Sequence, residues 1–128
     1  MKKKLPKPTE GELEILRIIW EQGPSTVRTV NDRLSTMKEV GYTTTLKIMQ
    51  IMAEKGLLKR DTSGKTHIYH SSVSKQKTQQ QLVDRLMEAA FGGSAMQLVM
   101  QALGNKPSTA EEIKEIRAFL DQLEGGKK

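Results

Sequence analysis

The most constraining feature of the sequence is a change in the spacing of its apolar residues after Gly56. Before that glycine, apolar residues recur every three or four positions in three blocks, as they do along the buried face of a helix. Gly23-Pro24 and Gly41 separate these blocks. After Gly56, two short strand-like runs, 57–60 and 67–70, flank a polar turn, which is typical of a β-hairpin. The sequence therefore predicts three helices followed by a hairpin.

Residues with side-chain oxygens indicate where the predicted helices begin. Thr9 and Glu12 have the spacing of a capping box, in which each side chain bonds the backbone amide of the other residue. Ser25 is expected to cap the second helix. The third helix is expected to begin near Thr43, whose hydroxyl is itself a candidate cap, and to end at Gly56.

A second helical region follows the predicted hairpin and contains three segments. Gly92-Gly93 and a turn over 104–107 separate the segments. Ser94 is expected to cap the second segment, and Ser108 with Glu111 has the spacing of another capping box. Each segment carries a stripe of apolar residues. The main members of these stripes are Leu82, Leu86, Phe91, Met96, Leu98, Val99, Leu103, Ile113, Ile116, Phe119 and Leu120.

The composition excludes several classes of protein and site. The chain has 128 residues and no cysteine, which rules out disulfides, thiolate zinc sites and a cysteine nucleophile. It has no nucleophile–base motif or phosphate-binding glycine loop, so we expect neither an enzyme nor a cofactor. His67 and His70 lie three apart in a predicted strand and point to opposite faces, so no metal site is expected. No apolar run approaches the roughly 20 residues that span a bilayer, and no secretory signal is present, so we expect a cytoplasmic protein without a membrane partner.

The positive charge is confined to one part of the chain. The net charge is +6, and residues 1–75 carry all of it, with 14 basic and 8 acidic residues; residues 76–128 carry 7 of each. A basic excess in one segment favours contact with a polyanion, either nucleic acid or an anionic membrane. The alternative is a basic surface that only maintains solubility.

The predicted order of elements is that of a winged helix-turn-helix, in which the third helix lies in the DNA major groove. Thr43, Thr44, Lys47 and Gln50 are expected on the outward face of that helix, as candidates for contacts to bases and phosphates. Thr45 falls on the apolar stripe and is expected to be buried. The fold class is therefore mainly α with a small β-hairpin.

Basic residues also accompany the predicted hairpin, which would form the wing. Lys59, Arg60 and Lys65 bracket its turn and are candidates for contacts to the DNA backbone or minor groove. Arg28, early in the second helix, is a candidate phosphate ligand beside that helix's positive end. Leu46 and Ile51 fall off the buried stripe of the third helix, and their roles stay open between thymine contacts and packing.

Two other functions are compatible with this pattern. A winged helix can dock on another protein through its third helix, and such a module would bind no duplex. A general architectural protein would bind DNA with little difference between an operator and a random duplex.

The sequence resembles the penicillinase-repressor family of bacterial transcriptional regulators (BlaI/MecI/CopY type). The resemblance covers nearly the whole chain and depends on the order and spacing of short pieces. The matching pieces are Leu13-Glu14-Ile15-Leu16 with Trp20, Thr26-Val27-Arg28 with Val30, Tyr42-Thr43-Thr44, Glu54-Lys55-Gly56-Leu57-Leu58 with Arg60, Leu86, Phe91-Gly92-Gly93-Ser94, and Glu111-Glu112-Ile113 with Ile116-Arg117.

The resemblance implies a homodimer that binds palindromic operators and represses transcription. It also implies that the last three helices form the dimer interface, which agrees with their neutral charge and apolar stripes, although the stripes could also form a core within one chain. The expected organisation is a winged-helix DNA-binding domain over residues 1–72 and a three-helix dimerisation arm over residues 73–128.

Two departures from the family limit what the resemblance implies. Relatives that are switched by a membrane sensor protease are cleaved at an asparagine–phenylalanine bond, and the aligned pair here is Gln101-Ala102. This difference counts against cleavage of this chain and makes a sensor protease a weak candidate partner. Copper-responsive relatives bind metal through C-terminal cysteines, which this chain lacks.

Overall fold

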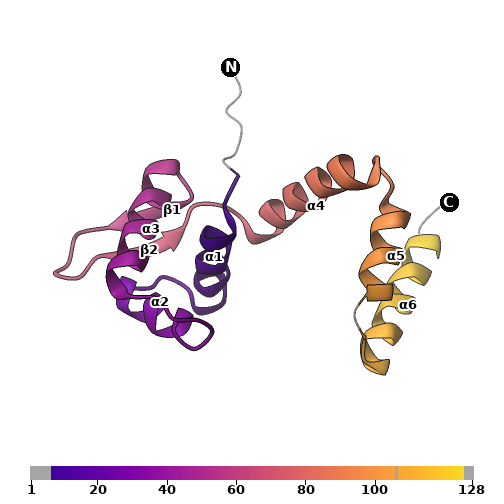
Figure 1. Ribbon diagram of the computed structural model, residues 1–128, viewed down its shortest axis with the longest axis horizontal. Coiled ribbons are helices and arrows are strands. Elements are labelled where there is room, and N and C mark those ends of the chain that lie inside the picture. Colours follow the sequence, from indigo (N-terminus) through magenta and orange to yellow (C-terminus); the bar gives the residue numbers. More distant parts are fainter. Residues whose placement is uncertain (1–6, 106, 126–128) are drawn as a thin grey trace, which may run out of the picture. The chain divides into compact units, whose positions relative to one another are not determined.

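The computed structural model describes residues 7–105 and 107–125 (Figure 1). These residues form mainly helices with one two-stranded antiparallel hairpin, as the sequence predicts. The elements are α1 (Glu10–Gln22), α2 (Val27–Leu34), α3 (Tyr42–Lys55), β1 (Leu58–Asp61), β2 (Ile68–Ser71), α4 (Lys75–Phe91), α5 (Ala95–Asn105) and α6 (Ala110–Gly125). Each strand lies one residue later than predicted, and α4 begins at Lys75 instead of residue 73.

The chain divides into two compact units, residues 1–79 and 80–128. The division falls inside α4 and not at the end of the hairpin. The functional boundary between residues 72 and 73 stays a prediction.

The first unit is built around one apolar core. Helices α1, α2 and α3 pack against one another, and the hairpin packs against α1 and α3 (Figure 1). In the hairpin, Lys59 pairs with His70 and Arg60 pairs with Tyr69. The buried apolar residues are Ile15, Leu16, Ile18, Ile19, Val27, Val30, Leu34, Met49, Met52, Leu57, Leu58 and Tyr69.

The start of α2 differs from the sequence prediction. The cap is Thr26, whose hydroxyl accepts a hydrogen bond from the Thr29 amide at 3.1 Å, so the prediction of Ser25 is wrong. Ser25 is instead buried, and its amide and carbonyl bond Tyr69 of β2 at 2.9 and 2.8 Å. This bridge lies on the edge of β2 opposite β1, because Tyr69 also pairs with Arg60, and it leaves Thr26 to cap the helix.

The other helix starts give a mixed result. The capping box of Thr9 and Glu12 is present at α1, and Ser94 caps α5 by accepting from the Gln97 amide at 3.1 Å. At α6 the capping box consists of Thr109 and Glu112, with hydrogen bonds of 3.1 and 3.0 Å. The prediction of Ser108 and Glu111 is therefore wrong by one residue.

The second unit has no buried core of its own among the residues that the structure describes. Helices α5 and α6 contain no buried residue, and the only buried residue of α4, Thr78, belongs to the first unit. Large apolar side chains are exposed instead: Met96 by 70%, Phe119 by 58% and Leu120 by 54%. Exposed apolar side chains of this size are unusual on the surface of a soluble monomer.

Candidate nucleic-acid interface

Helix α3 has one buried face and one exposed face. Thr45, Met49 and Met52 are each completely buried in the core, as the apolar stripe predicts. The opposite face carries four polar side chains that are exposed to solvent. These are Thr43, Thr44, Lys47 and Gln50.

The N-terminus of α3 has no side-chain cap. Gly41 occupies the cap position, and no side chain bonds the free amides there, so Thr43 is not the cap. The Thr43 and Thr44 hydroxyls are therefore at the surface in the first turn of the helix. The two residues with open roles differ: Leu46 is half-buried and packs against the core, whereas Ile51 is 40% exposed.

Asn31 in α2 holds the start of α3 in place. Its side-chain amide donates to the Val40 carbonyl at 3.1 Å and to the Thr45 hydroxyl at 2.8 Å. The Thr45 hydroxyl in turn donates to the Gly41 carbonyl at 3.3 Å. The turn between the two helices is thus bonded to both of them. Sequence periodicity did not indicate Asn31, because an asparagine in a helix is usually a surface residue.

An ion pair holds the other end of α3. The Lys55 ammonium lies 2.8 and 3.0 Å from the two carboxylate oxygens of Glu12, whose side chain is only 6% exposed. The same carboxylate accepts the Thr9 amide in the capping box of α1 at 2.9 Å. The two ends of α3 are therefore fixed by polar contacts, and its exposed face has a defined orientation in the first unit.

The wing carries exposed cations and one carboxylate. Lys59, Arg60 and Lys65 are all exposed. The Asp61 carboxylate accepts hydrogen bonds from the Ser63 amide at 2.9 Å and from the Ser63 hydroxyl at 2.8 Å. These two hydrogen bonds, the backbone one first, lower the pKa of Asp61 below its ordinary value. The wing turn is thus closed by an ionised side chain.

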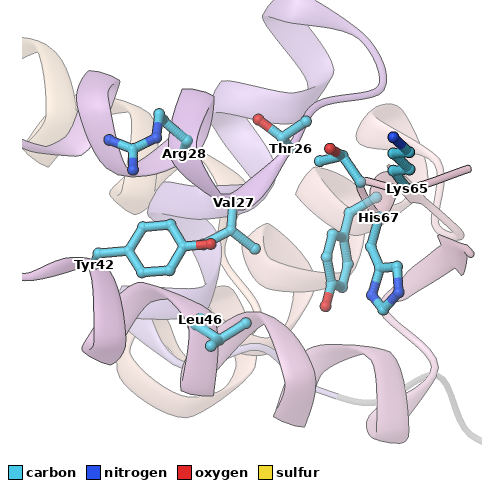
Figure 2. Close-up of a pocket in the computed structure, with 9 residues that line it drawn as sticks. Thr26, Val27, Arg28, Tyr42, Leu46, Lys65 and His67 are labelled. Carbon is cyan, nitrogen blue, oxygen red and sulfur yellow. The ribbon is translucent and has the colours of Figure 1, made fainter.

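A groove of about 460 Å³ lies between the starts of α2 and α3 and the wing (Figure 2). Arg28 and Tyr42 stand on one side of it, and Lys65 and His67 stand on the other. The Arg28 guanidinium carbon lies 5.5 Å from the centre of the Tyr42 ring, within the range of a cation–π contact. The described residues that line the groove are Thr26, Val27, Arg28, Tyr42, Leu46, Lys65, Thr66, His67 and Tyr69.

Four of the predicted site residues fall into two groups, one lining the groove and the other lining a second hollow. Arg28 and Lys65 share the groove, whereas Gln50 and Arg60 line a hollow of about 400 Å³ together with Ala53 and Glu54. Both hollows adjoin α3. Sequence patterns did not indicate Tyr42, His67 or Tyr69 as groove residues, because nothing local signals that segments 25 residues apart will meet.

The two histidines lie in different surroundings. His67 precedes β2 and lines the groove, so its placement in a strand is wrong, whereas His70 lies in β2. Among the described residues, no group of three or more His, Asp or Glu side chains is placed to hold a metal ion. No helix in the described ranges has both the length and the apolar character that a membrane span requires.

The sequence matches a family model described as penicillinase repressor over residues 8–122. This chain belongs to the penicillinase-repressor family. One relative in the family is the penicillinase repressor of Bacillus licheniformis, which is 22% identical over 126 residues, 98% of each chain. Another is the transcriptional regulator BlaI of Mycobacterium tuberculosis, which is 28% identical over 120 residues, 91% of this chain and 86% of the relative. The family is one of transcriptional repressors and not a class of enzyme.

Solved structures in the penicillinase-repressor family share the fold. The solution structure of the DNA-binding domain of the repressor BlaI matches 58% of this chain and 90% of its own, with a TM-score of 0.51 and 23% identity. The Bacillus licheniformis BlaI monomeric form in complex with the blaP half-operator matches 59% and 92%, also with a TM-score of 0.51 and 23% identity. The winged helix-turn-helix predicted from the sequence is therefore confirmed as the fold.

Proposed function

We propose that this chain is a homodimeric repressor that binds a palindromic DNA operator and inserts α3 of each copy into the major groove. One observation carries the proposal: α3 is fixed at both ends and leaves a continuous polar face of Thr43, Thr44, Lys47 and Gln50 exposed. An α-helix fits the major groove, and these side-chain types bond base edges and phosphates. A repressor of this kind meets its operator in the bacterial cytoplasm.

The proposed contacts divide by chemistry. Gln50 suits an adenine, Lys47 suits a guanine or a phosphate, and the two threonines can bond phosphates or contact thymine methyl groups. The remaining cations would contact the DNA backbone and supply affinity without sequence preference. These cations are Arg28, Lys59, Arg60 and Lys65.

The apolar surface of the second unit supports dimerisation. A stable dimer buries about 800 Å² per partner, with an apolar centre. Residues 80–128 expose large apolar side chains on all three helices, and an apolar hollow of about 460 Å³ between α4 and α5 adds a concave surface. The proposed interface residues are Leu82, Leu86, Phe91, Met96, Leu98, Val99, Leu103, Ile113, Ile116, Phe119 and Leu120. We place the functional division after residue 72, with residues 73–128 as the dimerisation arm.

Selection of preferred duplexes from a random pool with the purified full chain tests this proposal. The expected result is a two-fold symmetric motif whose half-sites are one or more helical turns apart. Binding without enrichment of any motif would instead identify an architectural protein. Binding to no duplex at low salt would contradict DNA recognition and favour a protein-interaction module, because phosphate contacts are strongest at low salt.

A further inference from the structure

We propose that the wing side of the groove is a seat for one DNA backbone phosphate, which the Tyr69 hydroxyl and the His67 ring bond together. The proposal rests on the proposed function, because its ligand is a phosphate of the operator. The proposal adds Tyr69 and His67, which lie outside α3, to the DNA-binding residues, and it assigns both of them to the same phosphate.

Tyr69 is the strongest indication of a ligand. The residue is only 1% exposed, because its ring is part of the core of the first unit. It also lines the groove, and the hydrogen bonds that join Tyr69 to Ser25 come from its backbone and not from its hydroxyl. The hydroxyl oxygen is not sealed off, since the structure contains no buried unpaired side-chain oxygen in the described ranges. The Tyr69 hydroxyl therefore reaches the surface of the groove, where it can donate a hydrogen bond to an acceptor that enters the groove.

His67 lies beside Tyr69 on the same face of the chain. The two residues are separated by one position, and Ile68 and Tyr69 belong to β2. Alternate residues of an extended segment point to the same side, and both side chains line the groove. A ring N–H of His67 and the hydroxyl of Tyr69 can therefore converge on one acceptor group.

The charge of the groove selects an anion. The described lining residues include the cations Arg28 and Lys65 and contain no aspartate or glutamate. The second hollow beside α3 contains Glu54 as well as Arg60, so it is less suited to an anion. Phosphate oxygens accept several donors at once, and charge-assisted hydrogen bonds are stronger than neutral ones.

The position of the groove favours a backbone phosphate over a free ion. It adjoins the uncapped start of α3, and its two sides are formed by α2 and the wing (Figure 2). A DNA strand beside an inserted α3 would pass along this groove. Arg28 stands on the opposite side of the groove from His67, and so it would contact a different phosphate of the same strand.

The Tyr69→Phe variant separates binding from folding. It removes only a hydroxyl at the surface of the groove, so the urea midpoint should not fall. Affinity for the duplex selected above should fall about 10-fold, as for loss of a hydrogen bond to a charged group. His67→Ala should give a loss of similar size. Arg17→Gln is the control for general effects, because Arg17 is an exposed residue of α1 that does not line the groove.

Single neutral methylphosphonate substitutions along the selected duplex identify the phosphate. At one position in each half-site, the substitution should weaken binding by the wild type about 10-fold. At the same position it should cause no further loss of binding by the Tyr69→Phe or His67→Ala variant. Arg28→Gln should be coupled to a different position, which shows that the method resolves neighbouring phosphates. Inorganic phosphate should compete no better than chloride at the same ionic strength.

Several results would contradict the proposed phosphate-binding site. The first is a Tyr69→Phe variant that binds the selected duplex as tightly as the wild type does. The second is coupling of Tyr69 and His67 to different phosphates or to none. If Tyr69→Phe lost as much free energy of unfolding as free energy of binding, its hydroxyl would have a structural role instead. Specific competition by inorganic phosphate would assign the groove to a free anion. Each of these leaves the proposed function intact, whereas binding to no duplex overturns both proposals.

Discussion

The side-chain amide of Asn31 donates a hydrogen bond to the hydroxyl of Thr45 at a distance of 2.8 Å. Thr45 is completely buried, and the bond joins α2 to the first turn of α3. A helix that reads DNA must be held at a fixed angle, and two polar groups of fixed geometry do this more specifically than apolar packing alone.

Thr45→Val is expected to lower the free energy of unfolding by about 1–2 kcal/mol, because it removes the acceptor of Asn31 without changing the side-chain shape. Urea denaturation measures the change. Thr36→Val is the matched control, since the Thr36 hydroxyl is exposed and bonds only the Arg33 carbonyl. The control should change stability by less than about 0.5 kcal/mol. Equal effects of the two variants would contradict a special role for the Asn31–Thr45 bond.

Glu12→Gln is expected to destabilise the protein by about 1–3 kcal/mol, because it breaks a largely buried ion pair and leaves Lys55 without its partner. The lower part of this range reflects the exposure of the Lys55 side chain, which is 33%. Glu14→Gln breaks the exposed pair with Lys38 and should cost no more than about 0.5 kcal/mol. Thermal or urea unfolding of the two variants side by side gives the comparison. A cost for Glu14→Gln as large as that for Glu12→Gln would refute the distinction.

Arg60→Ala is expected to weaken binding to selected and random duplexes by the same factor, because a phosphate contact carries no sequence information. The slope of log affinity against log salt should become shallower by about 1. Affinities measured at several salt concentrations give this slope. Arg17→Ala, on α1, is the control and should leave the slope as it is. An unchanged affinity and slope for Arg60→Ala would exclude Arg60 from the interface.

Phe119→Glu is expected to dissociate the dimer while leaving each chain folded, because Phe119 is 58% exposed in the single chain. Burying the new charge in the interface should raise the dimer dissociation constant at least about 30-fold. Sedimentation equilibrium measures the assembly, and circular dichroism checks the helix content. Gln122→Glu adds the same charge at an exposed position of α6 and should have little effect. A wild-type chain that is monomeric at micromolar concentration would contradict the proposed interface.

The order of the elements could be predicted because local patterns determine it. The three-to-four spacing of apolar residues located α1, α2 and α3, and Gly56 ended α3 where a positive φ of 89° is required. The exact caps could not be predicted at α2, α3 and α6. Ser25 and Thr26 are equally good caps by chemistry, and the choice depends on a backbone bridge between Ser25 and Tyr69.

The exposed face of α3 could also be predicted, since burying one stripe of a helix exposes the opposite one. The groove could not. Arg28, Tyr42 and His67 meet there only after α2, α3 and the wing have packed together. The bond of Asn31 to Thr45 was hidden for the same reason, because it depends on the angle between two helices.

We propose that the exposed face of α3 reads the operator sequence. The most direct test is the ratio of dissociation constants for a random duplex and the selected duplex, measured for wild type and for a variant carrying both Thr44→Ala and Gln50→Ala. We expect the wild-type ratio, about 1,000 or more, to fall by at least about 30-fold in the variant while affinity for the random duplex changes little. An unchanged ratio would show that other residues read the sequence and that the exposed face of α3 does not.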